Sequence, residues 1–332
     1  MTTKIVKNTD IEDAALCLKN GGTVVFPTET VYGLGADALN PDAIEKIYKA
    51  KGRPSDNPLI VHIASLDSVS MLAREITPNA SVLMDKFWPG PLTLIFKKQA
   101  SVPHKVTAGL DTVAVRFPSN EIAQKLIEQS GVLVAAPSAN LSGSPSPTVC
   151  EDVIADLNGR VDYIIDSTGC TIGLESTVVD VSGNETVILR PGAVTLEMIQ
   201  DLIPTARLDS GLVDLDSTPK CPGLKYKHYS PKAKVTVVQG DIQKVREYIL
   251  SHINSENIGV LTYKGSTYPD NVHIENGGDN MHEYAHNLFS ALRNFDKAGV
   301  VHVYAEFCVE NGIGVAVRNR LYKAADHNII EV

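Results

Sequence analysis

The sequence predicts an α/β protein with a mixed sheet between helices, followed by a smaller α/β domain. Three observations predict this fold. Short runs of β-branched and apolar residues alternate with segments whose apolar residues recur at helical spacing, which is typical of layered α/β domains. Several runs late in the first region follow one another without a helix, which indicates a mixed sheet. The alternation stops in a polar stretch at 209–220 and restarts at Lys234.

Sequence signals place the ends of several elements in the first region. Thr9 and Glu12 have the spacing of a capping box, which predicts a helix that Gly21 ends. Asn40 and Pro41 predict a second helix, because asparagine favours the N-cap and proline the first helical position. Apolar runs predict strands at 23–27, 58–64, 92–96, 112–118, 132–137, 162–166, 176–181 and 186–190, and helical segments at 66–87, 120–129 and 150–157.

The chain is predicted to contain two domains joined by a linker. The first domain covers residues 1–208, and the polar linker, 209–233, contains the motif PGLKYKHYSP. The second domain, 234–332, is long enough for a small Rossmann-like α/β unit of its own. Its expected elements are strands at 234–240, 258–263 and 300–307, and helices that end near 253, cover 280–297 and include 317–325.

The composition indicates a compact, acidic protein. Hydrophobic residues make up 43% and charged residues 21% of the 332 residues, which supports a packed core and argues against disorder. The net charge is −9, whereas proteins that bind nucleic acids or anionic membranes are usually basic, so an anion site here must be local. Five widely spaced cysteines without a C-x-x-C pair predict reduced thiols. With no apolar run long enough to span a membrane, we expect a soluble, cytoplasmic protein.

Two cations, Lys51 and Arg53, lie between the second helix and a buried strand. Gly52 can end the helix near Ala50 in a left-handed conformation, and Pro54 makes Arg53 extended. If the segment is extended, the two cations point to one side about 7 Å apart, which suits successive phosphates. The alternative is that both cations complement the helix dipole in water. The segment alone leaves both interpretations open.

Two predicted strands carry a polar residue among apolar neighbours. His62 lies in LIVHIA, where a histidine is usually a core residue with one hydrogen bond but can also line a pocket at a strand end. In TVAVRFP, alternation places Arg116 on one face with Thr112 and Ala114. A buried arginine needs a partner, so Arg116 is either an anchor for a carboxylate or part of an exposed edge strand.

A polar loop and a second Arg-Pro pair follow. The segment AAPSANLSGSPSPT, 135–148, leaves a buried strand and is dense in Ser, Asn, Gly and Pro. Its hydroxyl and amide groups can cradle phosphate or ribose, although ordinary surface turns have the same composition. Ser176 lies at a strand entry, and Arg190 at a strand exit is held extended by Pro191, which repeats the arrangement at Arg53.

Two other motifs resemble known binding sequences, one for a dinucleotide and one for zinc, but their surroundings argue against both functions. GLGADA, from Gly33, mimics a dinucleotide-binding turn, but the next predicted helix starts only at Pro41, and the chain has no Walker-type phosphate loop. HEYAH matches H-E-x-x-H with His282 and His286, and Glu306 follows as a candidate third zinc ligand. The histidines, however, lie beside the apolar face of their helix, on flanks expected to be solvated. A zinc hydrolase is therefore the weakest alternative.

The ordered set of motifs resembles one family. FPTETVYGLG, KGRPSDNPLIVHI, WPGPLT, DTVAVRFP, AAPSANLSGSPSPT and ESTVVD followed by ILRPG occur in this order. Together they resemble the YrdC-like L-threonylcarbamoyladenylate synthases over about residues 5–205, and PGLKYKHYSP with a second domain resembles the longer, two-domain form. The resemblance implies an open, twisted mixed sheet flanked by helices, with a concave, positively charged surface.

The resemblance implies a nucleotidyltransferase reaction. L-threonine, bicarbonate or CO2, and ATP would give L-threonylcarbamoyl-AMP and pyrophosphate, and a separate transferase complex would pass the threonylcarbamoyl group to tRNA. The substrate amine is the nucleophile, so the protein needs no nucleophile of its own and acts by positioning and charge stabilisation. Mg²⁺ is expected to arrive with the triphosphate.

The resemblance also assigns residues to each substrate. Lys51 and Arg53 would stabilise the phosphates during the reaction, and Arg116 would hold the threonine carboxylate. The expected ATP contacts are Lys51, Arg53, Asn57, Thr112, Ser138, Ser146, Arg190 and Tyr229. The expected L-threonine contacts are Thr30, His62, Arg116, Ala136 and Ser176. The roles of Asn140 and Ser142 stay open, and we hypothesise that Tyr229 belongs to a lid that the second domain restrains.

The alternative from another class is an RNA-binding module, since a basic concave surface can hold a duplex. The net charge of −9 argues against it, and we expect no stable complex with tRNA. Steep, salt-dependent RNA binding without ATP turnover would favour this alternative.

Overall fold

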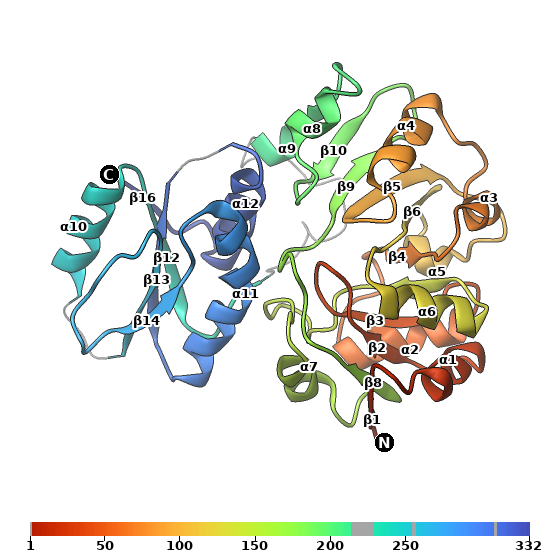
Figure 1. Cartoon of the computed structure of the whole chain (residues 1–332), viewed down its shortest axis with the longest axis horizontal. Helices are drawn as coiled ribbons and strands as arrows, with labels where there is room; N and C mark the ends of the chain where they lie inside the picture. Colours follow the sequence, from red (N-terminus) through yellow and green to blue (C-terminus); the bar gives the residue numbers. More distant parts are fainter. Residues whose placement is uncertain (1, 214–228, 254–256, 309–310) are drawn as a thin grey trace. The chain divides into compact units, whose positions relative to one another are not determined.

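A computed structural model describes residues 2–213, 229–253, 257–308 and 311–332 of the chain (Figure 1). These residues form two compact units. The first comprises the described residues of 2–142, 147–171 and 175–213, and the second comprises 143–146, 172–174 and the described residues from 229 onward. The predicted domain boundaries stay a prediction, and most of the PGLKYKHYSP motif lies outside the described residues.

The first unit is built on a mixed sheet of 11 strands. The sheet combines parallel pairs, such as β4 with β6, and antiparallel pairs, such as β5 with β6, so it is mixed as the sequence predicts. In order across the sheet the strands are β1 (Lys4–Lys7), β8 (Tyr163–Asp166), β2 (Val24–Phe26), β3 (Gly33–Asp37), β7 (Val134–Ala136), β4 (Ile60–His62), β6 (Thr112–Arg116), β5 (Leu92–Lys97), β9 (Thr177–Asp180), β10 (Val187–Arg190) and β11 (Arg207–Leu208).

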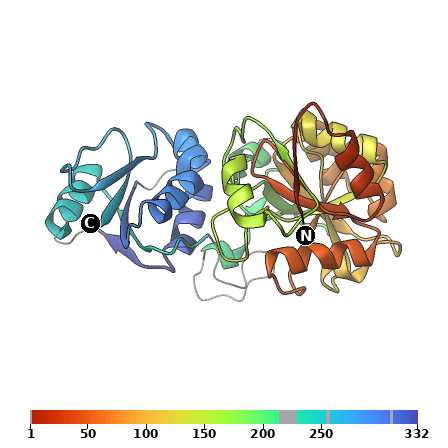
Figure 2. The same ribbon diagram turned by 90° about the horizontal axis from the view of Figure 1, so that it is seen from below.

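Helices cover both faces of this sheet, and the strands alternate between two cores. Val24 and Phe26 pack with helices α1 and α6, whereas Val25 packs in the core that includes helix α2. Figure 2 shows helices on both sides of this sheet. Tight alternation of this kind is what buries a sheet between two helical layers. The helices of the unit are α1 (Glu12–Lys19), α2 (Pro41–Lys51), α3 (Val69–Leu72), α4 (Pro78–Phe87), α5 (His104–Thr107), α6 (Glu121–Ser130), α7 (Cys150–Leu157), α8 (Leu196–Gln200) and α9 (Ser210–Val213).

Of two helix starts predicted from capping residues, the structure confirms one and contradicts the other. Asn40 caps α2 as predicted, because its side chain accepts hydrogen bonds from the amides of Asp42 and Ala43. The capping box at Thr9 is wrong: α1 begins at Glu12 after Ile11, and the Thr9 hydroxyl bonds to an adjacent aspartate. Glu12 is thus the first helical residue, whereas a capping box needs it at the third position.

The helical segments predicted between 66 and 87 are present, whereas three strands of this unit, β1, β3 and β11, were not expected. Helix α3 ends at Leu72, where Ala73 becomes extended and pairs with Lys98, and Thr77 caps α4 immediately before Pro78. GLGAD is strand β3. A Cβ on Gly35 would lie 2.6 Å from Val134 Cγ1, so this glycine serves the close packing of strands. That packing explains the glycine pattern without a dinucleotide.

The second unit contains a parallel sheet of five strands, which confirms the predicted smaller α/β domain. Helix α11 packs against it through the apolar stripe that the sequence predicts, from Met281 to Phe295. No described helix is long and apolar enough to cross a membrane. In sheet order the strands are β14 (His273–Asn276), β13 (Ile258–Thr262), β15 (His302–Phe307), β12 (Lys234–Gln239) and β16 (Ile329–Glu331), with helices α10 (Ile242–His252), α11 (Met281–Lys297) and α12 (Gly314–Ala324).

Candidate functional site

A row of polar side chains crosses the middle of the large sheet. Arg116, the last residue of β6, is in register with His62 of β4 and with Thr93 of β5. Residues directly opposite one another on neighbouring strands project from the same face, so these three side chains lie side by side. Each is at most 4% exposed. A buried row of this kind is stable only if its polar groups have partners.

Arg116 has such partners in the loop after β2. Its Nη2 lies 2.9 Å from Glu29 Oε1, and its Nη1 donates to the Thr30 hydroxyl at 2.9 Å. Burial alone would raise the pKa of Glu29, but the adjacent guanidinium outweighs it and holds this pKa below its ordinary value. Arg116 Nε has no hydrogen-bond partner among the residues that the structure describes. The exposed-edge alternative for Arg116 is therefore wrong, and its Nε is a buried donor without a described acceptor.

His62 is held as a neutral imidazole. Its Nδ1 lies 3.1 Å from the carbonyl oxygen of Ile60, which requires the proton on Nδ1 and leaves a lone pair on Nε2. Burial, together with the nearby Arg116 charge, lowers the pKa of His62 to about 3. The ring of Phe26 packs edge-on against it, with centroids 5.9 Å apart. His62 is thus a buried, neutral histidine that is hydrogen-bonded to the backbone of its own strand.

Ser176 and Arg190 extend the row toward the edge of the sheet. The Ser176 hydroxyl lies 2.8 Å from the Thr93 hydroxyl. Arg190, at the end of β10, donates from Nε to the Ser176 carbonyl at 3.0 Å and from Nη2 to its hydroxyl at 3.2 Å. The structure therefore brings an expected ATP contact, Arg190, next to an expected threonine contact, Ser176.

Lys51 differs from its predicted geometry. It is the last residue of α2, not part of an extended segment, and Gly52 follows in the left-handed conformation. Its side chain is only 3% exposed, so the solvated alternative is also wrong. The Lys51 ammonium donates to the carbonyl oxygens of Ser138 and of Asn140, the latter at 2.6 Å, and the Ser142 amide donates to the Lys51 carbonyl at 3.0 Å. Lys51 thus organises the loop that follows β7.

Arg53 and Asn57 lie in the turn that joins α2 to β4. Arg53 Nη2 donates to the carbonyl oxygens of Asn57 at 3.3 Å and of Pro58 at 3.4 Å. Asn57 is buried, and its Oδ1 has no hydrogen-bond partner among the described residues. Tyr48 supports the turn through its hydroxyl, 3.1 Å from the Asn57 carbonyl. An unpaired buried oxygen is costly, which is typical of a group that awaits a ligand.

The remaining expected contacts of the first unit fall on β6 and β7. Ala136 ends β7 opposite Ile60. Ser138 follows two residues later, and its hydroxyl donates to Asn140 Oδ1 at 2.5 Å. Thr112 opens β6, four residues before Arg116 and therefore about 13 Å along the strand. It is half-buried, so Thr112 and Arg116 mark the two ends of one strand.

Two expected ATP contacts belong to the second unit. Ser146 is fully buried there. Tyr229 has φ +63°, which is uncommon for a residue with a side chain, and its ring stacks on Phe289 with centroids 5.2 Å apart. The guanidinium carbon of Arg320 lies 5.8 Å from the same ring centre.

Glu29 is the site residue that sequence reasoning missed. It precedes Thr30 in the FPTETVYG motif, and a signal for it existed. An arginine in a strand with apolar neighbours requires a carboxylate nearby. Glu29, one residue before Thr30, supplies that carboxylate.

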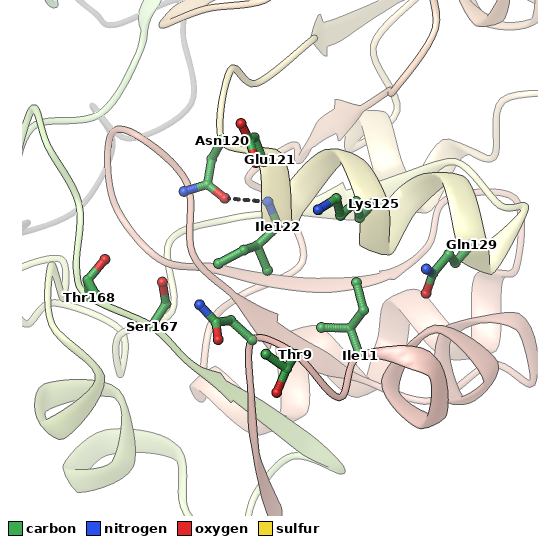
Figure 3. A pocket seen from close by; sticks show the side chains of 10 residues that line it. Thr9, Ile11, Asn120, Glu121, Ile122, Lys125, Gln129, Ser167 and Thr168 are labelled. Atoms are coloured by element: carbon green, nitrogen blue, oxygen red, sulfur yellow. Dashed lines mark hydrogen bonds between the residues drawn. The ribbon is translucent and has the colours of Figure 1, made fainter.

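A separate depression of about 690 Å³ lies near the start of α6 (Figure 3). Asn120, Lys125 and Gln129 line one side of it, and Thr9 and Ile11 line another. The side chain of Asn120 is engaged, because its Oδ1 accepts from the Ile122 amide at 3.0 Å. The depression contains none of the expected site residues and is distinct from the polar row.

The residues of the zinc alternative are engaged or exposed. His282 and His286 are exposed on α11. Glu306 is fully buried on β15, and its carboxylate accepts hydrogen bonds from the Tyr263 amide, the Ser266 hydroxyl and the Tyr268 hydroxyl. In the part of the chain that the structure describes, no group of three His, Cys, Asp or Glu side chains is placed to hold a metal ion. Glu306 therefore stabilises the second unit from within.

The sheet and its buried row define an α/β protein with a candidate site for small charged ligands. A family model described as "Telomere recombination", of the Sua5, YciO and YrdC proteins, matches residues 17–192. A second, described as "Threonylcarbamoyl-AMP synthase, C-terminal domain", matches residues 194–326. The chain belongs to the two-domain Sua5 family of threonylcarbamoyl-AMP synthases.

Similar proteins support this assignment over the full length. The chain is 48% identical to the threonylcarbamoyl-AMP synthase of Pyrococcus abyssi, with 97% of this chain and 96% of the relative aligned. It is 45% identical to the Bacillus subtilis protein of the same name, with 96% and 94% aligned. The crystal structure of P. abyssi Sua5 complexed with L-threonine matches with a TM-score of 0.93 and 46% identity, over 99% of this chain and 100% of that one.

Proposed function

We propose that this protein synthesises L-threonylcarbamoyl-AMP from L-threonine, bicarbonate or CO2, and ATP, with release of pyrophosphate. The observation that carries the proposal is the buried row around Arg116, whose free Nε faces no described partner. Family membership supports the reaction, and the L-threonine in the similar P. abyssi structure supports the amino acid. The modified AMP would serve the threonylcarbamoyladenosine modification of tRNA.

In this proposal the row binds L-threonine. Arg116 holds the carboxylate through Nε, while Thr30 and Glu29 fix the orientation of the guanidinium. Neutral His62 offers its Nε2 lone pair, which can accept a hydrogen bond from the amine or the hydroxyl of the substrate. Ser176, ordered by Thr93 and Arg190, offers a hydroxyl, and Ala136 offers backbone groups at the end of β7.

The chemistry then needs positioning more than a protein nucleophile. The threonine nitrogen attacks the carbon of CO2 and loses a proton, which gives a carbamate. A carbamate oxygen attacks the α-phosphorus of ATP, and the bond to the bridging oxygen breaks as pyrophosphate leaves. Held in line, these groups react without a covalent enzyme intermediate. Negative charge gathers on the phosphates, which is where fixed cations contribute most.

For ATP, the proposal assigns Lys51, Arg53 and Asn57 to the phosphates. Thr112, Ser138, Ser146, Arg190 and Tyr229 complete the expected nucleotide contacts. Mg²⁺, which would arrive with the triphosphate, neutralises charge on the phosphate oxygens when bound. Asn57 Oδ1, a buried oxygen without a described hydrogen-bond partner, is the type of ligand that this ion prefers.

We further propose a cytoplasmic location and a downstream transferase complex as the acceptor of the product. The four described cysteines are free thiols, which is consistent with a reducing compartment. A mixed anhydride of a carbamate and AMP hydrolyses readily, so prompt consumption by a partner reaction fits its chemistry.

The reaction is tested by incubating the full chain with ATP, Mg²⁺, bicarbonate and L-threonine and measuring pyrophosphate. Release should require both threonine and bicarbonate, and release without either one would contradict the proposal. Arg116→Ala should raise the KM for L-threonine, and Arg53→Ala should raise the KM for ATP. If both variants changed the same constant, the assignment of the two subsites would be wrong.

A further inference from the structure

Helix α11 of the second unit contacts segments that lie far from it in sequence. The unit includes residues 143–146 and 172–174, although its other described residues begin at 229. Segment 143–146 is part of the loop to which the proposed function assigns an ATP contact, Ser146. The contacts that hold this segment therefore decide where that contact lies.

Arg293 on α11 holds the segment through one carbonyl group. The Arg293 side chain is 8% exposed, and its Nε and Nη2 donate to the Pro145 carbonyl oxygen at 3.0 and 2.6 Å. The second contact is short, as expected when the donor is charged. Two donors from one rigid guanidinium fix both the position and the direction of the accepting oxygen.

The bond geometry passes this restraint to Ser146. The Pro145 carbonyl belongs to the planar peptide that includes the nitrogen and Cα of Ser146. Proline rings at 145 and 147 fix their own φ angles and restrict the residues before them. The segment is thus stiff on both sides of the peptide that Arg293 holds, so Ser146 has little freedom left.

The same helix also holds the second ATP contact that the proposed function assigns to this unit. Phe289, one turn before Arg293, stacks on the ring of Tyr229, and the Ser230 amide donates to the Gly143 carbonyl at 3.0 Å. Residues four apart lie on one face of a helix. Segment 172–174 packs on the helix backbone, since a Cβ on Gly173 would lie 2.5 Å from His286 Cα.

We propose that Arg293 is a positioning residue for ATP: it fixes the Pro145–Ser146 peptide so that Ser146 is ordered before the nucleotide binds. The proposal rests on the proposed function, because it takes Ser146 as an ATP contact. Arg293 itself touches no substrate in this proposal. Its loss should therefore weaken ATP binding and leave threonine binding unchanged.

The test compares Arg293→Met and Arg293→Lys with a matched control, Arg246→Met. Arg246 is a half-buried arginine of the same unit that also donates to backbone carbonyls, those of Tyr263 and Lys264, but it contacts neither 143–146 nor Tyr229 in the described structure. Arg246→Met controls for general loss of stability in the unit. The lysine variant keeps the charge and much of the length, and is the variant to use if the methionine variant does not fold.

The readout is the KM for ATP and, separately, the KM for L-threonine in pyrophosphate release. Arg293→Met should raise the ATP KM about tenfold, because displacement of a group by a fraction of an ångström is costly at a reacting centre. Arg293→Lys should raise the KM for ATP less, because the lysine ammonium can still donate to the Pro145 carbonyl, although it lacks the two fixed donors of the guanidinium. Both Arg293 variants should keep the KM for threonine within about twofold of its value in the unmodified chain. Arg246→Met should keep the KM for ATP and the KM for threonine within the same range.

Two results would overturn the proposal. One is an ATP KM in folded Arg293→Met, or in Arg293→Lys if only that variant folds, equal to that of the unmodified chain. The other is an equal rise in ATP KM for Arg246→Met, which would make the effect one of stability. Failure of the proposed function is recognised separately, because the unmodified chain would then show no threonine- and bicarbonate-dependent release.

Discussion

The buried pair of Glu29 and Arg116 gives the sharpest prediction. The two side chains are 8% and 4% exposed and lie 2.9 Å apart. Glu29→Gln removes the negative charge and keeps the shape, so Arg116 becomes a buried cation without a counter-charge from Glu29. Breaking one side of a buried pair costs about 3–5 kcal/mol. We expect a loss near 3 kcal/mol in the free energy of unfolding, because the glutamine carbonyl can still accept a hydrogen bond.

L-threonine should restore part of this loss. At a concentration of about 100 times its Kd, a ligand stabilises the folded state by about 2.7 kcal/mol. In Glu29→Gln, the threonine carboxylate replaces the lost counter-charge of Arg116, so threonine should bind about tenfold more tightly. That is worth about 1.4 kcal/mol more stabilisation than in the unmodified chain at the same threonine concentration.

The assay is urea unfolding with and without L-threonine, at several pH values. The pKa of Glu29 lies below its ordinary value, so its contribution is present above the unfolded pKa of about 4.3 and is lost as the pH falls through the lower folded value. The curves of the two proteins should therefore converge in acid. Above about pH 6, Glu29 should no longer change the difference in the free energy of unfolding between the two proteins.

An exposed pair provides the control. Glu185 lies 2.6 Å from Arg207, but the side chains are 72% and 54% exposed. Glu185→Gln should cost about 0–1 kcal/mol and leave the threonine effect unchanged. The reasoning is refuted if Glu29→Gln costs no more than this control, or if threonine stabilises Glu29→Gln no more than the unmodified chain. The second result would mean that Glu29 attracts the substrate ammonium more than it competes with the carboxylate.

Three further predictions concern the histidine, the lysine and the metal. His62 has a folded pKa of about 3, so below about pH 6.5 the unfolded chain binds a proton that the folded chain does not. The free energy of unfolding should therefore fall by about 1.4 kcal/mol for each pH unit below 6.5. His62→Gln should remove this slope in urea titrations. A pH-independent difference between the two proteins would contradict it. Lys51→Met leaves the Ser138 and Asn140 carbonyls without their shared donor. It should therefore lower the free energy of unfolding by about 1–3 kcal/mol and raise the KM for ATP. If neither quantity changed, Lys51 would not organise the loop. Chelation of Mg²⁺ should stop pyrophosphate release but leave L-threonine binding, measured by calorimetry, unchanged, and a loss of threonine binding would place the metal in the threonine row.

The sequence predicted most of the fold because its signals are local. Asn40 and Pro41 start α2 in the structure, and the apolar stripe of α11 is buried as its spacing predicts. The capping box at Thr9 failed because several residues near a helix start can compete, and the chain took the start that buries Ile11. Strand β3 was missed because its glycines look like a loop, whereas they allow a close approach to Val134 that only tertiary structure reveals.

The site was predicted less completely, for a physical reason. Which residue types the site contains follows from motifs, but the partner of each depends on chain segments far apart. Lys51 was placed on an extended segment, yet helix α2 continues through it and directs its ammonium to carbonyls 87 and 89 residues further on. Arg293 carried no signal at all, because its partner carbonyl is 148 residues away and any residue type offers a carbonyl.

The two buried cations are compensated in different ways, and the difference matches the two proposed substrates. The Lys51 ammonium donates to the carbonyl oxygens of Ser138 and Asn140, which are neutral groups. In the proposed function this cation serves the triphosphate of ATP, which is a polyanion. Arg116 is paired with a carboxylate, and the adjacent His62 is neutral, so this part of the row has no net charge. A zwitterion such as an amino acid enters it without leaving an unbalanced charge, whereas a polyanion would meet Glu29. In the proposed function, Glu29 beside Arg116 therefore favours a zwitterion over a polyanion at this end of the row.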